Sequence, residues 1–137
     1  MKILITGANG LLGQKLVYAL KGREGFEVIA TAKGENRIKD QQNYIYEPLD
    51  ITNQQAVMSI VSRLKPDCII NTAAMTNVDA CEQNVDECKK LNVDAVQYLI
   101  EASEKYNVHL IHLSTDFVFD GSSGPYSETD IPAPQSY

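Results

Sequence analysis

The chain has 137 residues, of which 44% are hydrophobic, which is enough for one hydrophobic core and therefore for one domain. Its formal net charge of −6 argues against nucleic acid or an anionic membrane surface as the default partner. No apolar run is long enough for a membrane span, and glycine interrupts the N-terminal apolar run too early for a signal peptide.

Strand-like and helix-like hydrophobic patterns alternate along the chain. Apolar runs predict strands over residues 2–6, 26–31, 44–46, 67–71 and 108–113. Helical spacing predicts helices over residues 11–22, 52–64 and 85–106. We expect residues 33–43 to form a loop or a weak helix, and residues 121–137 to form a loop.

Two of these helices carry further signals. In the first helix, Leu12, Leu16 and Leu20 share the face that we expect to be buried. Thr52 is placed to cap the second helix through its hydroxyl group, and Pro66 lies just beyond its end.

Alternating strands and helices indicate right-handed crossovers and a parallel sheet. The sequence therefore predicts an α/β fold, a doubly wound parallel sheet of the NAD(P)-binding Rossmann-like kind, truncated after its fifth strand. In the expected strand order 3-2-1-4-5, the order reverses between strands 1 and 4, and ligands bind at the carboxyl ends of the strands there.

Three glycines, Gly7, Gly10 and Gly13, directly follow the first apolar run. This pattern is typical of a tight turn from a buried strand to a helix N-terminus, where backbone N–H groups and the helix dipole hold a pyrophosphate. The spacing differs from the Gly-x-Gly-x-x-Gly of many dehydrogenases. A turn that merely needs positive φ is the alternative, but it does not require three glycines. We therefore expect a dinucleotide-binding unit.

Two more polar segments are expected at the same edge of the sheet. Residues 71–74 follow the fourth strand, and residues 114–116 follow the fifth. Their convergence with the glycine turn is stronger support for a ligand site than any one of the three segments alone.

The end of the second strand favours NADP(H) over NAD(H). An acidic residue there binds the ribose 2′-hydroxyl of NAD, whereas a basic residue suits a 2′-phosphate. This chain has Lys33 and Arg37, and no carboxylate before Glu35. The alternative is that both cations are ordinary solvated loop charges.

Asp50 and Ile51 follow the third strand, beside the expected position of an adenine ring. Asp50 could accept a hydrogen bond from the adenine amino group while Ile51 packs on the ring. An equally good interpretation makes Asp50 a turn residue next to the helix. Tyr44 and Tyr46 alternate on the short third strand and are expected to be packing residues.

Ser114 and Thr115 end the fifth strand at the expected mouth of the cleft, where a hydroxyl group could polarise a substrate carbonyl. Such residues are also common in turns and caps. Tyr137 could act as a general acid, but its ordinary pKa requires a nearby cation, and no lysine follows it in this chain. A terminal residue without a role is the alternative.

The remaining residue types capable of metal chemistry give no metal site. Cys68, Cys81 and Cys88 are odd in number and lack the spacing of metal ligands, so we expect reduced, buried thiols of a cytoplasmic protein. His109 and His112 lie three residues apart on one strand and face opposite sides, so we expect buried or half-buried structural histidines.

Several segments together resemble the extended short-chain dehydrogenases/reductases, specifically those of the dTDP-4-dehydrorhamnose reductase type. The matching segments are residues 7–13, 71–79 with Glu82, 91–93, 114–121, 125–130 and 132–134. The segments 114–121 and 125–134 are the most specific, and the resemblance covers essentially the whole chain.

The resemblance implies roles for individual residues. Together with the residue patterns above, it gives a set of expected cofactor contacts: Gly7, Asn9, Gly10, Leu11, Leu12, Gly13, Lys33, Asp50, Ile51, Ala73, Ala74, Met75, Thr76 and Asn92. Within this set, residues 10–12 would contact the phosphates, residues 74–76 would line the nicotinamide side, and Asn92 would hold the active-site helix and its water. Thr115 would bind the substrate carbonyl, Asp116 would touch the sugar, and Tyr137 would donate the proton.

The resemblance also implies a longer parent protein. Its lysine would follow Tyr137 by four residues, and its substrate-binding lobe would follow the incomplete domain at residues 1–137. The parent would use NADPH, with NAD(H) as an open second choice, to reduce the C4 carbonyl of dTDP-4-dehydro-L-rhamnose. We expect this chain alone to lack that turnover, and we leave a homodimer open.

Two alternatives remain. One is another nucleotide-sugar epimerase or dehydratase, which the lack of an acidic residue at the second strand disfavours. The other is a non-catalytic module, because residues 131–134 resemble the NADP-binding regulatory β subunit of methionine adenosyltransferase.

Overall fold

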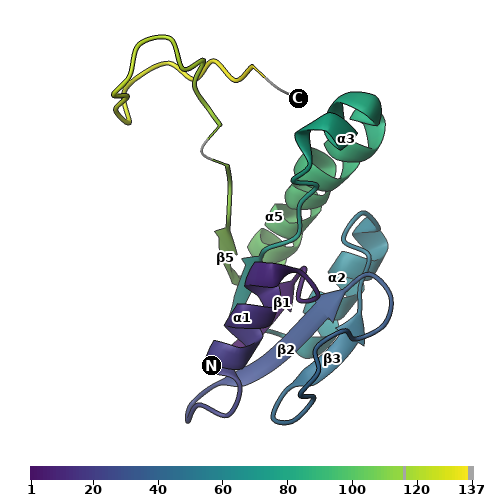
Figure 1. Cartoon of the computed structure of the whole chain (residues 1–137). Helices are drawn as coiled ribbons and strands as arrows, with labels where there is room; N and C mark the ends of the chain where they lie inside the picture. The colour runs from purple at the N-terminus through teal and green to yellow at the C-terminus, as the bar shows by residue number, and fades with distance from the viewer. Residues whose placement is uncertain (116, 136–137) are drawn as a thin grey trace.

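A single parallel sheet forms the centre of the computed structural model, which describes residues 1–115 and 117–135. Its strands are β1 (Lys2–Thr6), β2 (Glu27–Ala32), β3 (Ile45–Pro48), β4 (Cys68–Asn71) and β5 (His109–His112). They lie side by side in the order β3-β2-β1-β4-β5, all parallel (Figure 1). The expected order is therefore confirmed, and the order reverses between β1 and β4.

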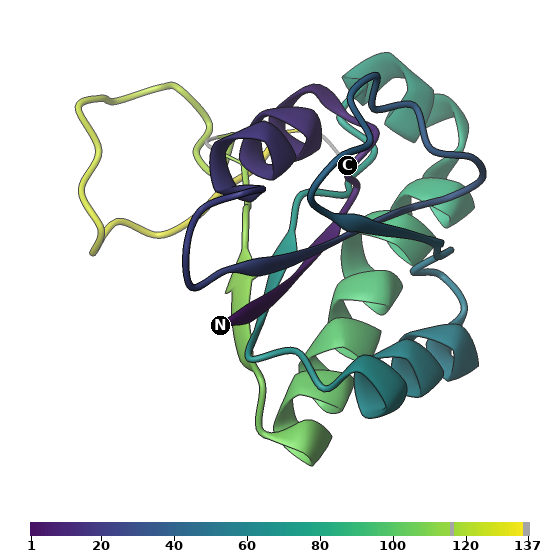
Figure 2. The same ribbon diagram turned by 90° about the horizontal axis from the view of Figure 1, so that it is seen from below.

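Helices cover both faces of this sheet. They are α1 (Leu11–Leu20), α2 (Gln54–Leu64), α3 (Val78–Gln83), α4 (Val85–Lys89), the π-helical turn η1 (Lys90–Asp94) and α5 (Ala95–Tyr106). Figure 2 shows α1 on one side of the strands and α2 with α5 on the other. This arrangement is the doubly wound α/β architecture expected from the alternating pattern.

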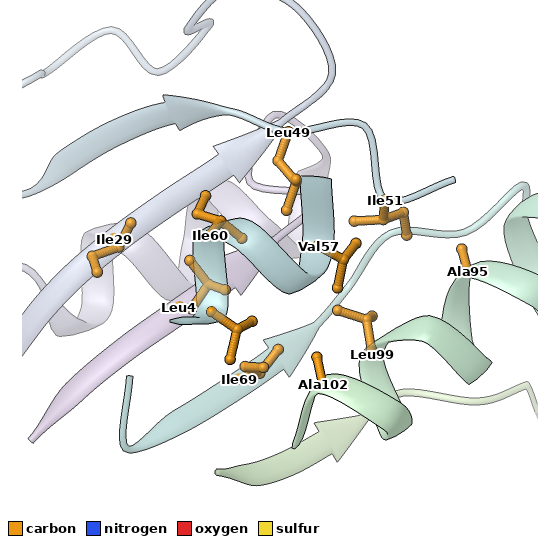
Figure 3. Close-up of a cluster of buried hydrophobic side chains, with 11 residues drawn as sticks. Leu4, Ile29, Leu49, Ile51, Val57, Ile60, Ile69, Ala95, Leu99 and Ala102 are labelled. Carbon is orange, nitrogen blue, oxygen red and sulfur yellow. The ribbon is translucent and has the colours of Figure 1, made fainter. Parts of the chain in front are cut away.

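The strands are apolar runs because successive side chains feed two separate cores. Leu4, Ile29 and Ile69 point to the face that α2 and α5 cover, where they meet Val57 and Leu99 (Figure 3). Each such fully buried side chain stabilises the fold by roughly 1.5–3 kcal/mol. The helices α2 and α5 are therefore packed against the middle strands of the sheet.

The opposite face packs under α1. Ile3, Ile5 and Val28 alternate with the residues of the first core and meet Val17 of α1 there. Ile38 joins this cluster although it lies in the loop after β2, and it is only 1% exposed. Residues 33–43, expected to form a loop or a weak helix, form a loop that is anchored by this buried side chain.

The buried face of α1 differs from the prediction. Gly13 and Val17 are buried, Leu16 and Leu20 are partly buried, and Leu12 is exposed. Leu12 lies in the first turn of α1 and belongs to neither hydrophobic core. Its burial was wrongly predicted from periodicity alone.

Two helix boundaries also differ. Asn53, not Thr52, caps α2, since its side chain accepts a hydrogen bond from the Ala56 N–H, while Thr52 hydrogen-bonds to Asp50. The long helix expected over 85–106 is divided into α4, η1 and α5, and it is preceded by α3. The π-helical turn adds a residue to one turn and so shifts the helix phase.

The expected redox state of the cysteines was wrong. All three are buried, as predicted, but Cys81 and Cys88 form a disulfide and only Cys68 is a free thiol. The prediction of buried histidines was also wrong, because His109 and His112 are both exposed on β5, the edge strand.

The segment over residues 117–135 stands apart from the sheet (Figure 1). Its loop is closed by a hydrogen bond from the Ala133 N–H to the Val118 carbonyl and by stacking of Phe119 on Tyr126. Asp120 accepts a hydrogen bond from the Tyr126 hydroxyl at 2.7 Å. Within residues 1–115 and 117–135, no helix is both long and apolar enough to cross a bilayer.

Candidate cofactor-binding site

A cavity of about 460 Å³ opens at the carboxyl edge of the sheet, where the strand order reverses. This volume lies in the range of small-molecule sites. Nine residues predicted from the sequence line it: Gly7, Gly10, Lys33, Asp50, Ile51, Thr72, Ala73, Ala74 and Met75. The carboxyl ends of four strands therefore converge on one cavity.

The glycine turn is held close to the turn after β4. Gly7 has a φ of +68°, and a Cβ atom there would lie 2.6 Å from the Ala73 nitrogen. At Gly13 a Cβ atom would lie 2.7 Å from Cα of Ala8, so the helix sits directly on the turn. Neither position tolerates a side chain, and that close approach explains two of the three glycines.

The N-terminus of α1 has free backbone donors beside this cavity. The N-cap residue Gly10 offers no side-chain hydrogen bond, and the first turn has no acidic residue. Leu11 is 82% exposed, so the first turn is open to a ligand. Unpaired N–H groups and the positive end of the helix dipole favour an anion at this position.

Asn9 fastens the loop after β2 to the glycine turn. Its Nδ2 donates to the Glu35 carbonyl at 2.8 Å, and its Oδ1 accepts from the Arg37 N–H at 2.9 Å. The Tyr46 hydroxyl donates to the carbonyl of the neighbouring residue Gly34 at 2.9 Å. Arg37 does not line the cavity, but its backbone is fixed beside the turn that does.

Asp50 already has partners for both carboxylate oxygens. Oδ1 accepts from the Thr52 hydroxyl at 2.7 Å, and Oδ2 pairs with Lys33 Nζ at 2.9 Å. The hydrogen bond from Thr52, followed by the contact with Lys33, lowers the pKa of Asp50 to about 2 although partial burial opposes this shift. The same pair raises the pKa of the exposed Lys33 ammonium group. Asp50 is therefore an ionised turn residue that also lines the cavity.

A buried polar chain fixes the turn after β4. Asn71 Oδ1 accepts from the Thr6 hydroxyl at 2.5 Å and from the Ala73 N–H at 3.2 Å. Asn71 Nδ2 lies 3.0 Å from His112 Nδ1. These contacts join the ends of β1, β4 and β5, so the network holds the cavity wall at Ala73 in place.

Asn92 positions the cavity wall but does not line it. Its Oδ1 accepts from the Met75 N–H at 2.8 Å, and its Nδ2 donates to the Met75 carbonyl at 3.0 Å. Both backbone groups of Met75 are thereby satisfied by one side chain of the π-helical turn η1. No local sequence pattern predicts this contact, because Met75 precedes α3 and Asn92 follows α4 in the chain.

The other predicted residues lie outside the cavity lining. Asn9, Leu11, Leu12, Gly13 and Thr76 flank it, and Thr115 is exposed, where its hydroxyl accepts a hydrogen bond from the Phe117 N–H at 3.1 Å. Asp116 and Tyr137 lie outside the described residues. Sequence analysis missed six lining residues: Ala32, Leu49, Thr52, Glu87, Lys90 and Leu91.

A known protein family matches the chain over its whole length. The family described as "RmlD substrate binding domain" matches residues 1–137. The chain belongs to this family. The RmlD-type relatives include dTDP-4-dehydrorhamnose reductase of Aggregatibacter actinomycetemcomitans, which is 44% identical over 95% of this chain and 40% of that protein. Another is methionine adenosyltransferase 2 subunit beta of Bos taurus, 34% identical over 97% of this chain and 38% of that protein.

Solved structures confirm the Rossmann-like fold of this RmlD-family chain. A dTDP-4-dehydrorhamnose reductase from Clostridium acetobutylicum matches with a TM-score of 0.83 and 41% identity, over 99% of this chain and 44% of that chain. The enzyme of that name from Bacillus anthracis, solved in complex with NADP, matches with a TM-score of 0.75 and 32% identity, over 98% of this chain and 44% of that chain.

A more distant structure holds a different cofactor. MoeE5, solved in complex with UDP-glucuronic acid and NAD, matches with a TM-score of 0.85 and 26% identity, over 99% of this chain and 44% of that chain. The RmlD-family chain thus spans about two fifths of the length of the curated relatives it matches.

Proposed function

We propose that this chain is the NADP(H)-binding part of a reductase that converts the C4 carbonyl of dTDP-4-dehydro-L-rhamnose to an alcohol. The observation that carries the proposal is the open, uncapped N-terminus of α1 beside a cavity whose rim bears Lys33. The dTDP-4-dehydrorhamnose reductases among the relatives support the reaction class.

The chain's own residues fit a dinucleotide. The free N–H groups after Gly10 would bind the pyrophosphate, Ile51 would pack against the adenine ring, and residues 73–75 would border the nicotinamide. When bound, NADPH supplies the hydride for the reduction. Thr72 to Met75 would hold the ring orientation and exclude water on that side.

The basic residues after β2 favour the 2′-phosphate of NADP(H). Lys33 is the first residue after the strand, and Arg37 is held nearby through Asn9. Neither position offers the carboxylate that would bind the 2′-hydroxyl of NAD(H). Binding of NAD(H) remains a weaker activity of the same site, in line with the NAD complex of MoeE5.

The substrate side is proposed from the resemblance of residues 114–121 and 125–134 to the reductases. Thr115 would donate a hydrogen bond to the carbonyl oxygen of the sugar, Asp116 would contact the sugar, and Tyr137 would donate the proton. A lysine four residues beyond Tyr137 in the longer protein would lower the pKa of the phenol. We propose that the chain alone binds cofactor without turnover.

Comparative binding tests the proposal. NADPH should bind the chain more tightly than NADH, and Lys33→Glu should weaken NADPH binding in fluorescence or calorimetric titrations. Tighter NADH binding, or an unchanged NADPH affinity in Lys33→Glu, would contradict the cofactor assignment. Reductase activity of the chain above a Tyr137→Phe control would contradict the expected lack of turnover.

A second candidate is a non-catalytic regulatory subunit, because subunit beta of methionine adenosyltransferase 2 from Bos taurus is 34% identical to this chain. The two candidates share the cofactor site and differ in what the whole protein does. Consumption of dTDP-4-dehydro-L-rhamnose by the full-length protein favours the reductase. Stable association with a methionine adenosyltransferase, without that consumption, favours the regulatory subunit.

A further inference from the structure

The helical hairpin of α3 and α4, residues 78–89, has an unusual interior. Cys81 and Cys88, joined by the disulfide, are the buried residues of this stretch, and its other side chains are exposed or partly exposed. Neither cysteine belongs to the two hydrophobic cores that flank the sheet. The disulfide therefore takes the place of a hydrophobic core in holding α3 against α4.

The same two sulfur atoms touch the residues that build the cofactor cavity. Cys81 Sγ lies 3.6 Å from the Met75 carbonyl oxygen, and Asn92 Nδ2 donates to Cys88 Sγ at 3.3 Å. Asn92 in turn clamps both backbone groups of Met75, which lines the cavity. Glu87, next to Cys88 in the chain, lines the cavity as well.

The contacts change with the redox state of the pair. In the disulfide, Cys81 has no proton to donate to the Met75 carbonyl, whereas a Cys81 thiol could donate one weak hydrogen bond. Reduction also removes the covalent link between α3 and α4. Since a thiol hydrogen bond is weaker than a covalent link, the net effect of reduction is to loosen the hairpin and the wall at Met75.

We propose that Cys81 and Cys88 form a thiol–disulfide redox site that tunes the affinity of the neighbouring cavity for its dinucleotide. This proposal rests on the cofactor site proposed above. In a reducing compartment, disulfides that do form are usually transient and redox-sensing or catalytic. The free thiol Cys68, buried in β4, lies outside this cluster.

The reaction is exchange with a dithiol reductant. A reductant thiolate attacks one sulfur of the pair, the Cys81–Cys88 bond breaks, and a mixed disulfide forms. The second thiol of the reductant then attacks this mixed disulfide and releases the protein cysteine, so the reductant is oxidised to a disulfide. The protein gains two electrons and, at neutral pH, two protons. Because both sulfurs are buried, attack follows local opening of α3, a six-residue helix packed chiefly on α4.

Reduction should weaken NADPH binding by about threefold to tenfold, because the wall at Met75 must then be ordered on binding. Coupling between the two equilibria is reciprocal. A tenfold effect on affinity therefore means that saturating NADPH makes the disulfide harder to reduce by about 30 mV.

The test compares NADPH affinity of the oxidised chain with that of the same chain reduced by dithiothreitol. Mass spectrometry without reductant should first show one disulfide and one alkylatable thiol, and three alkylatable thiols after mild oxidation would overturn the proposal. Cys81→Ser/Cys88→Ser should bind NADPH with the affinity of the reduced chain, and dithiothreitol should not change that affinity. Cys68→Ala should keep the full response, as the matched control.

Two results separate this proposal from the cofactor assignment. Equal NADPH affinity of the oxidised and reduced chains would overturn the redox coupling and leave the cofactor site intact. If neither state binds NADPH, hydrogen exchange of residues 72–92 decides: faster exchange on reduction supports a redox-controlled wall, and unchanged exchange overturns it.

Discussion

The Arg37 backbone N–H donates a hydrogen bond of 2.9 Å to Oδ1 of Asn9. Asn9 belongs to the glycine turn, and Arg37 belongs to the loop after β2, so one amide side chain joins the glycine turn to the basic loop. The buried Ile38 holds the next residue of that loop in the core. Arg37 is therefore fixed in backbone position while its side chain stays exposed.

Arg37→Gln should reduce NADPH affinity by about tenfold, because a charge-assisted hydrogen bond to phosphate contributes roughly 1.5–3 kcal/mol and is partly screened at an exposed site. NADH affinity should change less than twofold, since NADH lacks the 2′-phosphate. Titration of both nucleotides against both proteins measures this. Equal losses for NADPH and NADH would show that Arg37 acts on the fold and not on the 2′-phosphate.

Lys33→Gln provides the comparison. In the structure the Lys33 ammonium group already pairs with Asp50 at 2.9 Å, so binding a phosphate must compete with that carboxylate. The loss of NADPH affinity should be smaller than for Arg37→Gln. A larger loss would mean that Lys33 contributes more to NADPH binding than Arg37 does.

The sheet was predictable because its signals are local. The side chains of Ile3, Leu4 and Ile5 pack into both cores, and close backbone contacts with Ala73 and Ala8 require glycine at positions 7 and 13. Both the apolar run and the glycine spacing can be seen in a short stretch of sequence, without knowledge of distant contacts.

The missed features depend on contacts between distant residues or on a choice between near equals. Thr52 and Asn53 are both good N-caps, and only the bond from Thr52 to Asp50 decides between them. The Cys81–Cys88 pair spans a helix break at Asn84. The predicted helix over 85–106 contained Cys88 but not Cys81, so nothing in that prediction brought the two sulfurs together. Leu12 shares the helical spacing of Leu16 and Leu20 but is exposed, so periodicity alone does not indicate where the buried face of the helix begins.

Gly7→Ala should destabilise the chain by about 3 kcal/mol, since it adds the cost of a side chain at positive φ to an overlap with the Ala73 backbone. Gly25→Ala is the matched control: its φ is +84°, but no atom lies within 4 Å of the added Cβ. It should cost only about 1–2 kcal/mol. Urea denaturation of the two variants measures the difference, and equal losses would mean that the close approach of the two turns has no energetic weight.

The low pKa of Asp50 predicts an acid-sensitive contribution to stability. Its pKa is about 2 in the folded chain against an ordinary value of 3.8, so between these values the unfolded state binds more protons and stability rises with pH. The contribution is complete above about pH 5 and is lost as the pH falls through about 2. The free energy of unfolding of Asp50→Asn should therefore depend less on pH than that of the unsubstituted chain.

The size of this effect is modest because the Asp50 side chain is 35% exposed. Solvent screening limits it to on the order of 1 kcal/mol at neutral pH. The measurement is the free energy of unfolding in urea between pH 2 and 6. If the free energies of unfolding of Asp50→Asn and the unsubstituted chain change with pH in parallel, ionised Asp50 contributes no net stabilisation.

Asn71→Leu should test the buried network that shapes the cavity wall. Thr6 and Asn71 are both fully buried, so removing the Asn71 amide leaves the Thr6 hydroxyl and the Ala73 N–H without their hydrogen-bond partner. Each unsatisfied buried group costs about 1–3 kcal/mol, so a total loss of roughly 3 kcal/mol is expected, measured by urea denaturation. Thr6→Val/Asn71→Leu removes the orphaned hydroxyl and should recover about 1 kcal/mol of that loss. A double variant that is less stable than Asn71→Leu would mean that the Thr6 hydroxyl has another partner or that packing, not polar satisfaction, governs this edge of the sheet.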